Sequence, residues 1–231
     1  MQTGISINPH KVKHMQKSPI TTIAASASAE LIEKKSRFIG QACPVNSEQE
    51  AQEQLAKIKS GHRGARHNVY AWIIGVNNEF MRSSDDGEPA GTGGRPVLET
   101  LKKSGLQNVM IVVTRYFGGI LLGSGGLTRA YGKAAQLAIE AAPVVKKIPA
   151  QKYAITCSYP YLSKTEIILD QPGIEIADKI YGEQIAIIAA ISDQLFAKVQ
   201  TNLTNLSNGT IRIDELGEQL LIDELCPQNT D

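Results

Sequence analysis

The sequence predicts an α+β protein built from two domains, and three features of the chain support this interpretation. Its 231 residues are enough for one large domain or two small ones. Residues 1–150 contain 19 Lys and Arg against 11 Asp and Glu, whereas residues 151–231 contain 5 against 12. Strands and helices also begin to alternate regularly after Pro149. The two halves therefore differ in charge and in pattern, and the basic half is expected to meet anionic partners.

The composition excludes several classes of protein. Hydrophobic residues make up 42% of the chain, as in ordinary folded proteins, and no run of 18 apolar residues occurs, so we expect no membrane span. Cys43, Cys157 and Cys226 are scattered and odd in number, which argues against a disulfide framework or a zinc site. This cysteine usage favours a reducing, cytoplasmic location. Residues 1–18 show little periodicity and are expected to be a disordered lead or an over-early start.

The first domain is expected over residues 19–145. Two β-like stretches, Ile20–Ala25 and Ala29–Pro44, open it, and the second is interpreted as one solvent-facing strand. Ser47 and Glu50 have capping-box spacing and predict a helix. A strand, a short helix, the most apolar strand and a longer helix then follow, in the order Val69–Val76, Arg95–Ser104, Val109–Thr114 and Leu127–Ala141.

The second domain is expected over residues 150–231 and has a simpler pattern. Its predicted strands and helices follow one another in the order β-α-β-β-α-β, which is the order of ferredoxin-like domains. We find no chemistry-bearing motif in it and interpret its charges as a solvated acidic face. The predicted elements are Tyr153–Tyr159, Leu162–Asp170, Glu175–Tyr181, Gln184–Ile191, Asp193–Leu203 and Thr210–Ile222.

Ten of the 20 glycines lie between Gly87 and Gly126, nine of them in two loops that each lead into a predicted helix. Unpaired N–H groups at a helix N-terminus favour an anion, and glycines let the backbone approach phosphate oxygens closely. Arginines near both loops could add bidentate contacts. The bland alternative is that both loops are tight turns, and that either Tyr116 or Phe117 is a core residue.

We predict from these loops a surface that binds nucleic acid or other phosphates, with no catalytic residue. Its members combine cationic side chains and backbone amides, and Tyr116 and Phe117 beside Arg115 offer a surface on which a base could stack. The predicted residues are Arg66, His67, Arg82, Arg95, Arg115, Tyr116, Gly118, Gly119, Gly123, Ser124, Gly125, Gly126 and Arg129.

Asp85, Asp86 and Glu88 form an acidic cluster beside the first loop. The cluster could hold Mg²⁺ together with a phosphate, or it could be a turn whose carboxylates cap backbone N–H groups and pair with arginines. The turn is the preferred interpretation. Because His62 and His67 lack helical ligand spacing and a third ligand, we predict no metal site and no cofactor.

Four segments give the chain a resemblance to a known family. They are Lys35–Ile39, His67–Ala71, Arg82–Pro89 and Val113–Gly123. Together they resemble the YigZ / IMPACT family, also called uncharacterised protein family 0029, over residues 19–145. The resemblance implies a first domain like domain 2 of ribosomal protein S5 and, from the eukaryotic members, a role in the regulation of translation. It implies no established catalytic residue.

Our leading hypothesis is a non-enzymatic factor that binds RNA or the ribosome, with a possible protein partner in translation control and no membrane association. The alternative is an enzyme like the GHMP-type kinases, which share the S5-like fold. In that case Leu122–Leu127 would hold nucleotide phosphates and the acidic cluster a metal. A third possibility is a protein-interaction module whose acidic second domain binds a basic partner.

Overall fold

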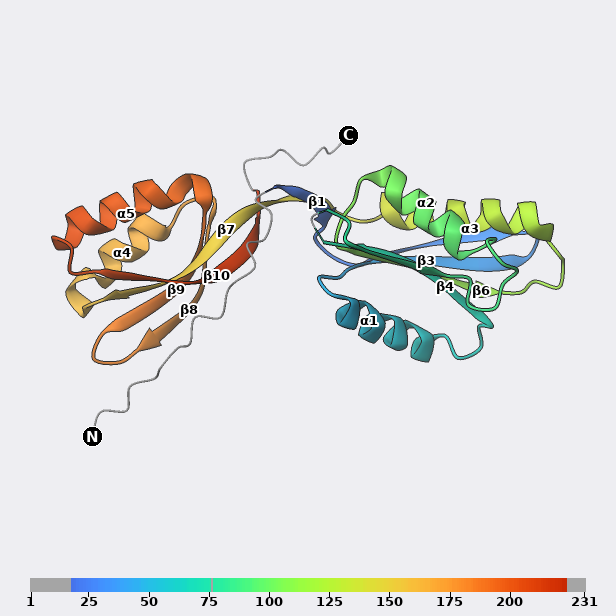
Figure 1. Cartoon of the computed structure of the whole chain (residues 1–231). Coiled ribbons are helices and arrows are strands. Elements are labelled where there is room, and N and C mark those ends of the chain that lie inside the picture. Colours follow the sequence, from blue (N-terminus) through green and yellow to red (C-terminus); the bar gives the residue numbers. More distant parts are fainter. Residues whose placement is uncertain (1–17, 76, 224–231) are drawn as a thin grey trace. The chain divides into compact units, whose positions relative to one another are not determined.

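The computed structural model describes residues 18–75 and 77–223, and its contacts divide the chain into two units (Figure 1). The first unit comprises Ile20–Lys146, and the second begins at Lys147. The predicted α+β class is confirmed. Cys226 and all but the last residue of the expected lead lie outside the described residues. In the described ranges no helix is long and apolar enough to cross a membrane.

The first unit contains a five-stranded antiparallel sheet with the strand order β2-β3-β6-β4-β5. Its central strand β6 is a β-branched run that is buried along all but its last residue, because both of its faces are covered. The five strands are β2 (Ala27–Glu33), β3 (Ser36–Pro44), β4 (His67–Ile74), β5 (Phe80–Ser84) and β6 (Val109–Tyr116). A short strand, β1 (Ile20–Ile23), precedes them and pairs with β7 (Val144–Cys157).

Three helices cover this sheet. Helices α2 (Gly94–Ser104) and α3 (Gly123–Glu140) lie on one face, and α1 (Glu48–Gly61) lies on the other (Figure 1). The larger core fills the space under α2 and α3, and a smaller one, which contains Trp72, fills the space under α1. The predicted cap is confirmed, since the Ser47 hydroxyl accepts a hydrogen bond from the Glu50 N–H at 3.1 Å.

The stretch from residue 29 to residue 44 corrects one prediction. It is a hairpin of β2 and β3 rather than one solvent-facing strand, and β3 is largely buried. The turn consists of Lys34 and Lys35, both with positive φ angles of 43° and 62°. Such turns usually carry Asn-Gly, so two lysines gave no turn signal. Strand β5 was not predicted either, because its exposed residues show no alternation.

The second unit has the predicted β-α-β-β-α-β order. Strand β7 is joined at one edge by β10 and at the other by β9, and β8 pairs with the far side of β9. Helices α4 and α5 pack on one face of this sheet over an aliphatic core. After β7 and a short 3-10 helix (Tyr159–Tyr161), the elements are α4 (Leu162–Leu169), β8 (Ile174–Tyr181), β9 (Ile185–Ser192), α5 (Asp193–Ser207) and β10 (Arg212–Ile222).

Candidate functional site

The first glycine-rich loop, which leads into α2, is closed by a carboxylate of the chain itself. Asp85 Oδ1 accepts hydrogen bonds from the N–H groups of Gly93 and Gly94 at 2.9 and 2.8 Å. Its Oδ2 accepts from the Gly91 N–H at 2.9 Å. The amides that the sequence offered to a phosphate are therefore occupied, and the turn interpretation of Asp85 describes these contacts.

The charge state of Asp85 follows from the same contacts. Burial acts to raise the pKa of this carboxyl, but the N–H groups of Gly91, Gly94 and Gly93 outweigh it and leave the pKa below its ordinary value. Asp85 is thus an anion in the folded protein, and the N–H groups of the loop bind it.

Asp86 fixes the start of β4 next to this loop. Its carboxylate accepts from the Lys59 ammonium at 2.8 Å and from the Asn68 N–H at 2.7 Å. Its backbone carbonyl lies 2.9 Å from His67 Nδ1. Since a carbonyl can only accept, Nδ1 carries the proton, and Nε2 is left facing Glu88 Oε1 at 3.9 Å.

Glu88 is the centre of a buried network. Its Oε1 accepts from Arg115 Nη1 at 2.7 Å and from the Tyr131 hydroxyl at 2.8 Å. Only 3% of the Glu88 side chain and 8% of the Arg115 side chain are exposed. Burial and the bond to Glu88 raise the pKa of Tyr131, so this hydroxyl stays protonated and donates. The network joins the first loop to β6 and α3.

The Arg115 guanidinium also lies between two aromatic rings. Its central carbon is 5.4 Å from the centroid of Phe38 and 5.5 Å from the centroid of Phe117. Phe38 is fully buried, whereas 50% of Phe117 is exposed. Both distances lie within the range of cation–π attraction, which holds the Phe117 ring at the surface.

Phe117 forms one wall of a small hollow, which we call the arginine hollow. It has a volume of about 200 Å³ and is lined by Arg66, His67, Arg115, Phe117 and Leu121. Arg66 is exposed and forms no ion pair among the residues that the structure describes. The hollow therefore combines positive charge with a half-exposed aromatic ring, as sites for single-stranded nucleic acid do.

The second glycine-rich loop, which leads into α3, is open. Its N-cap position is Leu122, which offers no side-chain acceptor to the first N–H groups of the helix. No carboxylate comparable to Asp85 reaches these groups within the described part of the chain. Gly118 has a structural role, since its N–H donates to Ser36 Oγ at 3.1 Å and a Cβ there would collide with the backbone of Lys35.

The structure separates several of the predicted site residues. Arg82 pairs in register with Trp72, and its guanidinium lies 5.7 Å from that ring, on the face covered by α1. Tyr116 lies on the same face, with its hydroxyl 2.9 Å from His62 Nδ1. Arg115, one residue earlier in β6, points to the opposite face.

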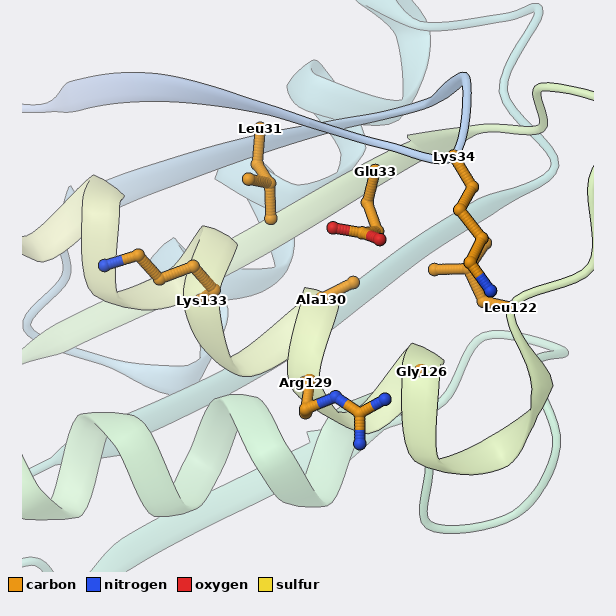
Figure 2. A pocket seen from close by; sticks show the side chains of 8 residues that line it. All are labelled: Leu31, Glu33, Lys34, Leu122, Gly126, Arg129, Ala130 and Lys133. Carbon is orange, nitrogen blue, oxygen red and sulfur yellow. The ribbon is translucent and has the colours of Figure 1, made fainter.

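The remaining predicted residues also lie apart. Arg95 is exposed in the first turn of α2 and does not line the arginine hollow, and Arg129 lines a different groove on α3 (Figure 2). The expectation that one of Tyr116 and Phe117 is a core residue is wrong, because Tyr116 is half-buried and Phe117 is half exposed. Each ring lies at the sheet margin instead, held by a hydrogen bond or by Arg115.

The structure adds Leu121 to the site residues, and of the two rings predicted as a stacking surface it places Phe117, not Tyr116, in the arginine hollow. Phe117 was visible next to Arg115 in the sequence, but its exposure was not. Leu121 is 82% exposed, and nothing in its sequence context signals this. Among the residues described, no three His, Cys, Asp or Glu side chains are grouped so that they could hold a metal ion.

Two family models match the chain, and each match falls within one of the two units. Residues 34–139 match the family model described as the Impact N-terminal domain, and residues 155–210 match a domain of unknown function, DUF1949. The chain is 38% identical over 194 residues to the IMPACT family member YvyE of Bacillus subtilis (strain 168), covering 84% of this chain and 89% of YvyE.

Two further relatives extend the comparison. The IMPACT family member YigZ of Escherichia coli (strain K12) is 34% identical over 182 residues, which cover 78% of this chain and 89% of YigZ. A solved structure, described as "Crystal structure of an hypothetical protein", has a TM-score of 0.63 at 32% identity and covers 86% of this chain and 97% of its own. The chain therefore belongs to the IMPACT family.

Proposed function

We propose that this protein is an RNA-binding factor linked to the regulation of translation, acting on RNA alone or within the ribosome. A single strand would bind in the arginine hollow, with a phosphate at Arg66 and one base stacked on Phe117. The observation that carries the proposal is the ladder of Phe38, Arg115 and Phe117, which ends in a half-exposed ring beside free positive charge.

The physical basis is that each contact in the ladder restricts the movement of the next side chain. Glu88 and Tyr131 fix Arg115, and Arg115 fixes the Phe117 ring, so little side-chain entropy is lost when a base stacks on it. Stacking on an aromatic ring tolerates any base, because every base has a π-face. Sequence-tolerant binding of a single strand is the expected behaviour.

The link to translation comes from the family. The resemblance found in the sequence implies such a role for eukaryotic members, and membership of the family supports extending it to this chain. A protein partner in translation control and a cytoplasmic location belong to the same proposal.

The test is a titration of the full chain with a fluorescent 12-nucleotide RNA at several salt concentrations. Phe117→Ala should weaken binding by about 1–3 kcal/mol, because one stacking platform is lost. Arg66→Ala should lower the slope of log affinity against log salt by about 0.7, the value for one phosphate contact on a single strand.

Matched controls come from the same unit. Phe80→Ala removes an equally exposed ring on β5, and Lys103→Ala removes an exposed charge at the far end of α2, so neither should change the affinity. Binding that is only millimolar, or that Phe117→Ala and Arg66→Ala leave unchanged, would contradict the proposal.

The kinase-like alternative gains no specific support. Asp85, Asp86 and Glu88, its expected metal ligands, accept from backbone amides, Lys59 and Arg115, respectively. A metal ion would have to displace these contacts before the three carboxylates could bind it.

A further inference from the structure

A second groove lies between the β2–β3 turn and α3, away from the arginine hollow. Figure 2 shows it from close by, and we call it the hairpin groove. Its volume is about 260 Å³, near the lower end for small-molecule sites. The side chains that matter for its chemistry are Leu31, Glu33, Lys34, Leu122, Arg129 and Lys133.

Three cations surround this groove. Lys34 comes from the turn, and Arg129 and Lys133 come from one face of α3, four residues apart. None of the three forms an ion pair within the described ranges, and all three are exposed. Lys133 donates a hydrogen bond to the Gln136 side chain at 3.4 Å. In Figure 2 the side chains of Lys34 and Lys133 lie at opposite ends of the groove, and Arg129 lies on α3 between them. Unpaired cations around one groove favour an anionic ligand.

Glu33 makes a simple anion an unsuitable ligand. Its carboxylate lies in the middle of the groove, between Leu31 and Leu122 (Figure 2). It has no hydrogen-bond or ion-pair partner within the described ranges. A carboxylate only accepts hydrogen bonds and repels other anions. The ligand must therefore present hydrogen-bond donors to Glu33 while it presents negative charge to the cations.

The walls of the groove suit a flat group. Leu31 and Leu122 are half-buried apolar side chains on either side of Glu33. Below them α3 contributes Gly126 and the buried Ala130 to the lining, and Leu122 packs over Gly126, where a Cβ would lie 2.9 Å from the Leu122 Cβ. A planar ring could thus lie between the two leucines with its edge toward the carboxylate.

The turn itself indicates that Lys34 has a role. Lys34 and Lys35 both have left-handed backbone conformations, which are costly for residues other than glycine and asparagine. An Asn-Gly turn would relieve this strain but would remove the Lys34 ammonium from the groove. Strain of this kind is often retained where the side chain is needed for function.

We propose that the hairpin groove binds a guanosine phosphate. Among the nucleobases, guanine has two adjacent N–H donors on its Watson–Crick edge, and these match the two oxygens of the Glu33 carboxylate. The ring would lie between Leu31 and Leu122, and the phosphates would contact Lys34, Arg129 and Lys133. The ligand is a free guanine nucleotide or a guanosine of an RNA strand, since both have this chemistry.

The test is isothermal titration calorimetry of the full chain with GDP, IDP, ADP and pyrophosphate. GDP should bind about tenfold more tightly than IDP, which lacks the guanine amino group, and more tightly still than ADP. Glu33→Gln should remove this preference, and Lys133→Ala should weaken all the phosphorylated ligands together. Glu30→Gln is the matched control, because Glu30 lies on the same strand but pairs with Arg37 at 2.8 Å.

The two sources are separated by competition in the Phe117→Ala variant, in which the arginine hollow is disabled. Displacement of GDP by a short oligoguanosine RNA but not by oligouridine would assign the groove to a guanosine of RNA; displacement by neither would assign it to the free nucleotide. Either result supports the groove. GDP affinity in this variant should equal that of the unmodified chain, so failure of the RNA proposal leaves this inference intact.

Two results would overturn the inference. One is the absence of GDP binding at millimolar concentration. The other is equal binding of GDP, ADP and pyrophosphate that Glu33→Gln leaves unchanged, because the groove would then be only a basic surface. Glu33 and Lys133 are exposed, so thermal unfolding of both variants should match that of the unmodified chain.

Discussion

The two glycine-rich loops of the first unit look alike in the sequence and differ in the structure. Each leads into a helix whose first N–H groups lack intrahelical partners. In the loop before α2, Asp85 accepts hydrogen bonds from three backbone N–H groups, those of Gly91, Gly93 and Gly94. In the loop before α3, no side chain takes that place in the described part of the unit. The first loop is thus closed by a carboxylate of the chain itself, and the second is not.

The comparison shows that glycines before a helix do not by themselves make an anion site. What decides is whether the chain supplies its own anion. A carboxylate that is tied down by the loop has a higher effective concentration than any dissolved phosphate, so it excludes one. The four predictions below test this difference, beginning with the largest expected effect.

Glu88→Ala should destabilise the protein most, by about 4 kcal/mol, because it leaves Arg115 buried without its counter-ion. Urea unfolding monitored by circular dichroism measures this change. Glu99→Ala is the control, since Glu99 forms an exposed pair with Lys102 and should contribute less than about 1 kcal/mol. Similar effects of the two substitutions would show that the buried network does not hold the first loop.

Asp85→Ala should cost about 3 kcal/mol, because three backbone N–H groups lose a charged acceptor. Ser124→Ala, in the first turn of α3, should change the free energy of unfolding by less than about 0.5 kcal/mol, since Ser124 is exposed and is not the N-cap residue. The same urea experiment measures both. If the two variants were equally stable, the contrast between the loops would fail.

Acid should abolish the contribution of Asp85 gradually. Its pKa is lowered in the folded protein, so its stabilisation is complete above the unfolded value of about 3.9 and is lost as the pH falls through the folded pKa. The stability difference between the unmodified chain and Asp85→Ala should be constant from about pH 5 to 7 and shrink below about pH 4. Unfolding curves across this range test the sign, and a difference that grows in acid would contradict it.

Gly125→Ala should have the smallest effect, a stabilisation of about 0.5 kcal/mol. A Cβ at this position has space, with Arg129 Nη1 nearest at 3.7 Å, and alanine loses less backbone entropy than glycine in a helix. Thermal unfolding measures the gain. Gly94→Ala is the contrast in the first loop. It should destabilise the protein, because a Cβ at this position would lie 2.7 Å from the Ser84 backbone. A stabilising Gly94→Ala would remove the distinction between the loops.

The candidate site was predicted in composition but not in arrangement. The sequence predicted a site around Arg115 in which charge, glycine and aromatic rings meet, and the structure brings Arg66, His67 and Phe117 to the hollow that Arg115 lines. The prediction failed to separate Arg82 from Arg115, because it did not use the register that places them on opposite faces of the sheet. It also assigned Arg115 to ligand binding, whereas Nη1 of that guanidinium already donates a hydrogen bond to Glu88.

Local patterns in the chain determined the α+β class, the cap at Ser47 and the order of elements in the second unit, because these depend on residues a few positions apart. Tertiary contacts decided that Glu88 pairs with Arg115 and that the Gly118 N–H donates to Ser36 Oγ, next to the Lys34–Lys35 turn. These two contacts join residues 27 and 82 positions apart. No local propensity encodes such a partner, since the choice depends on which surfaces the sheet brings together.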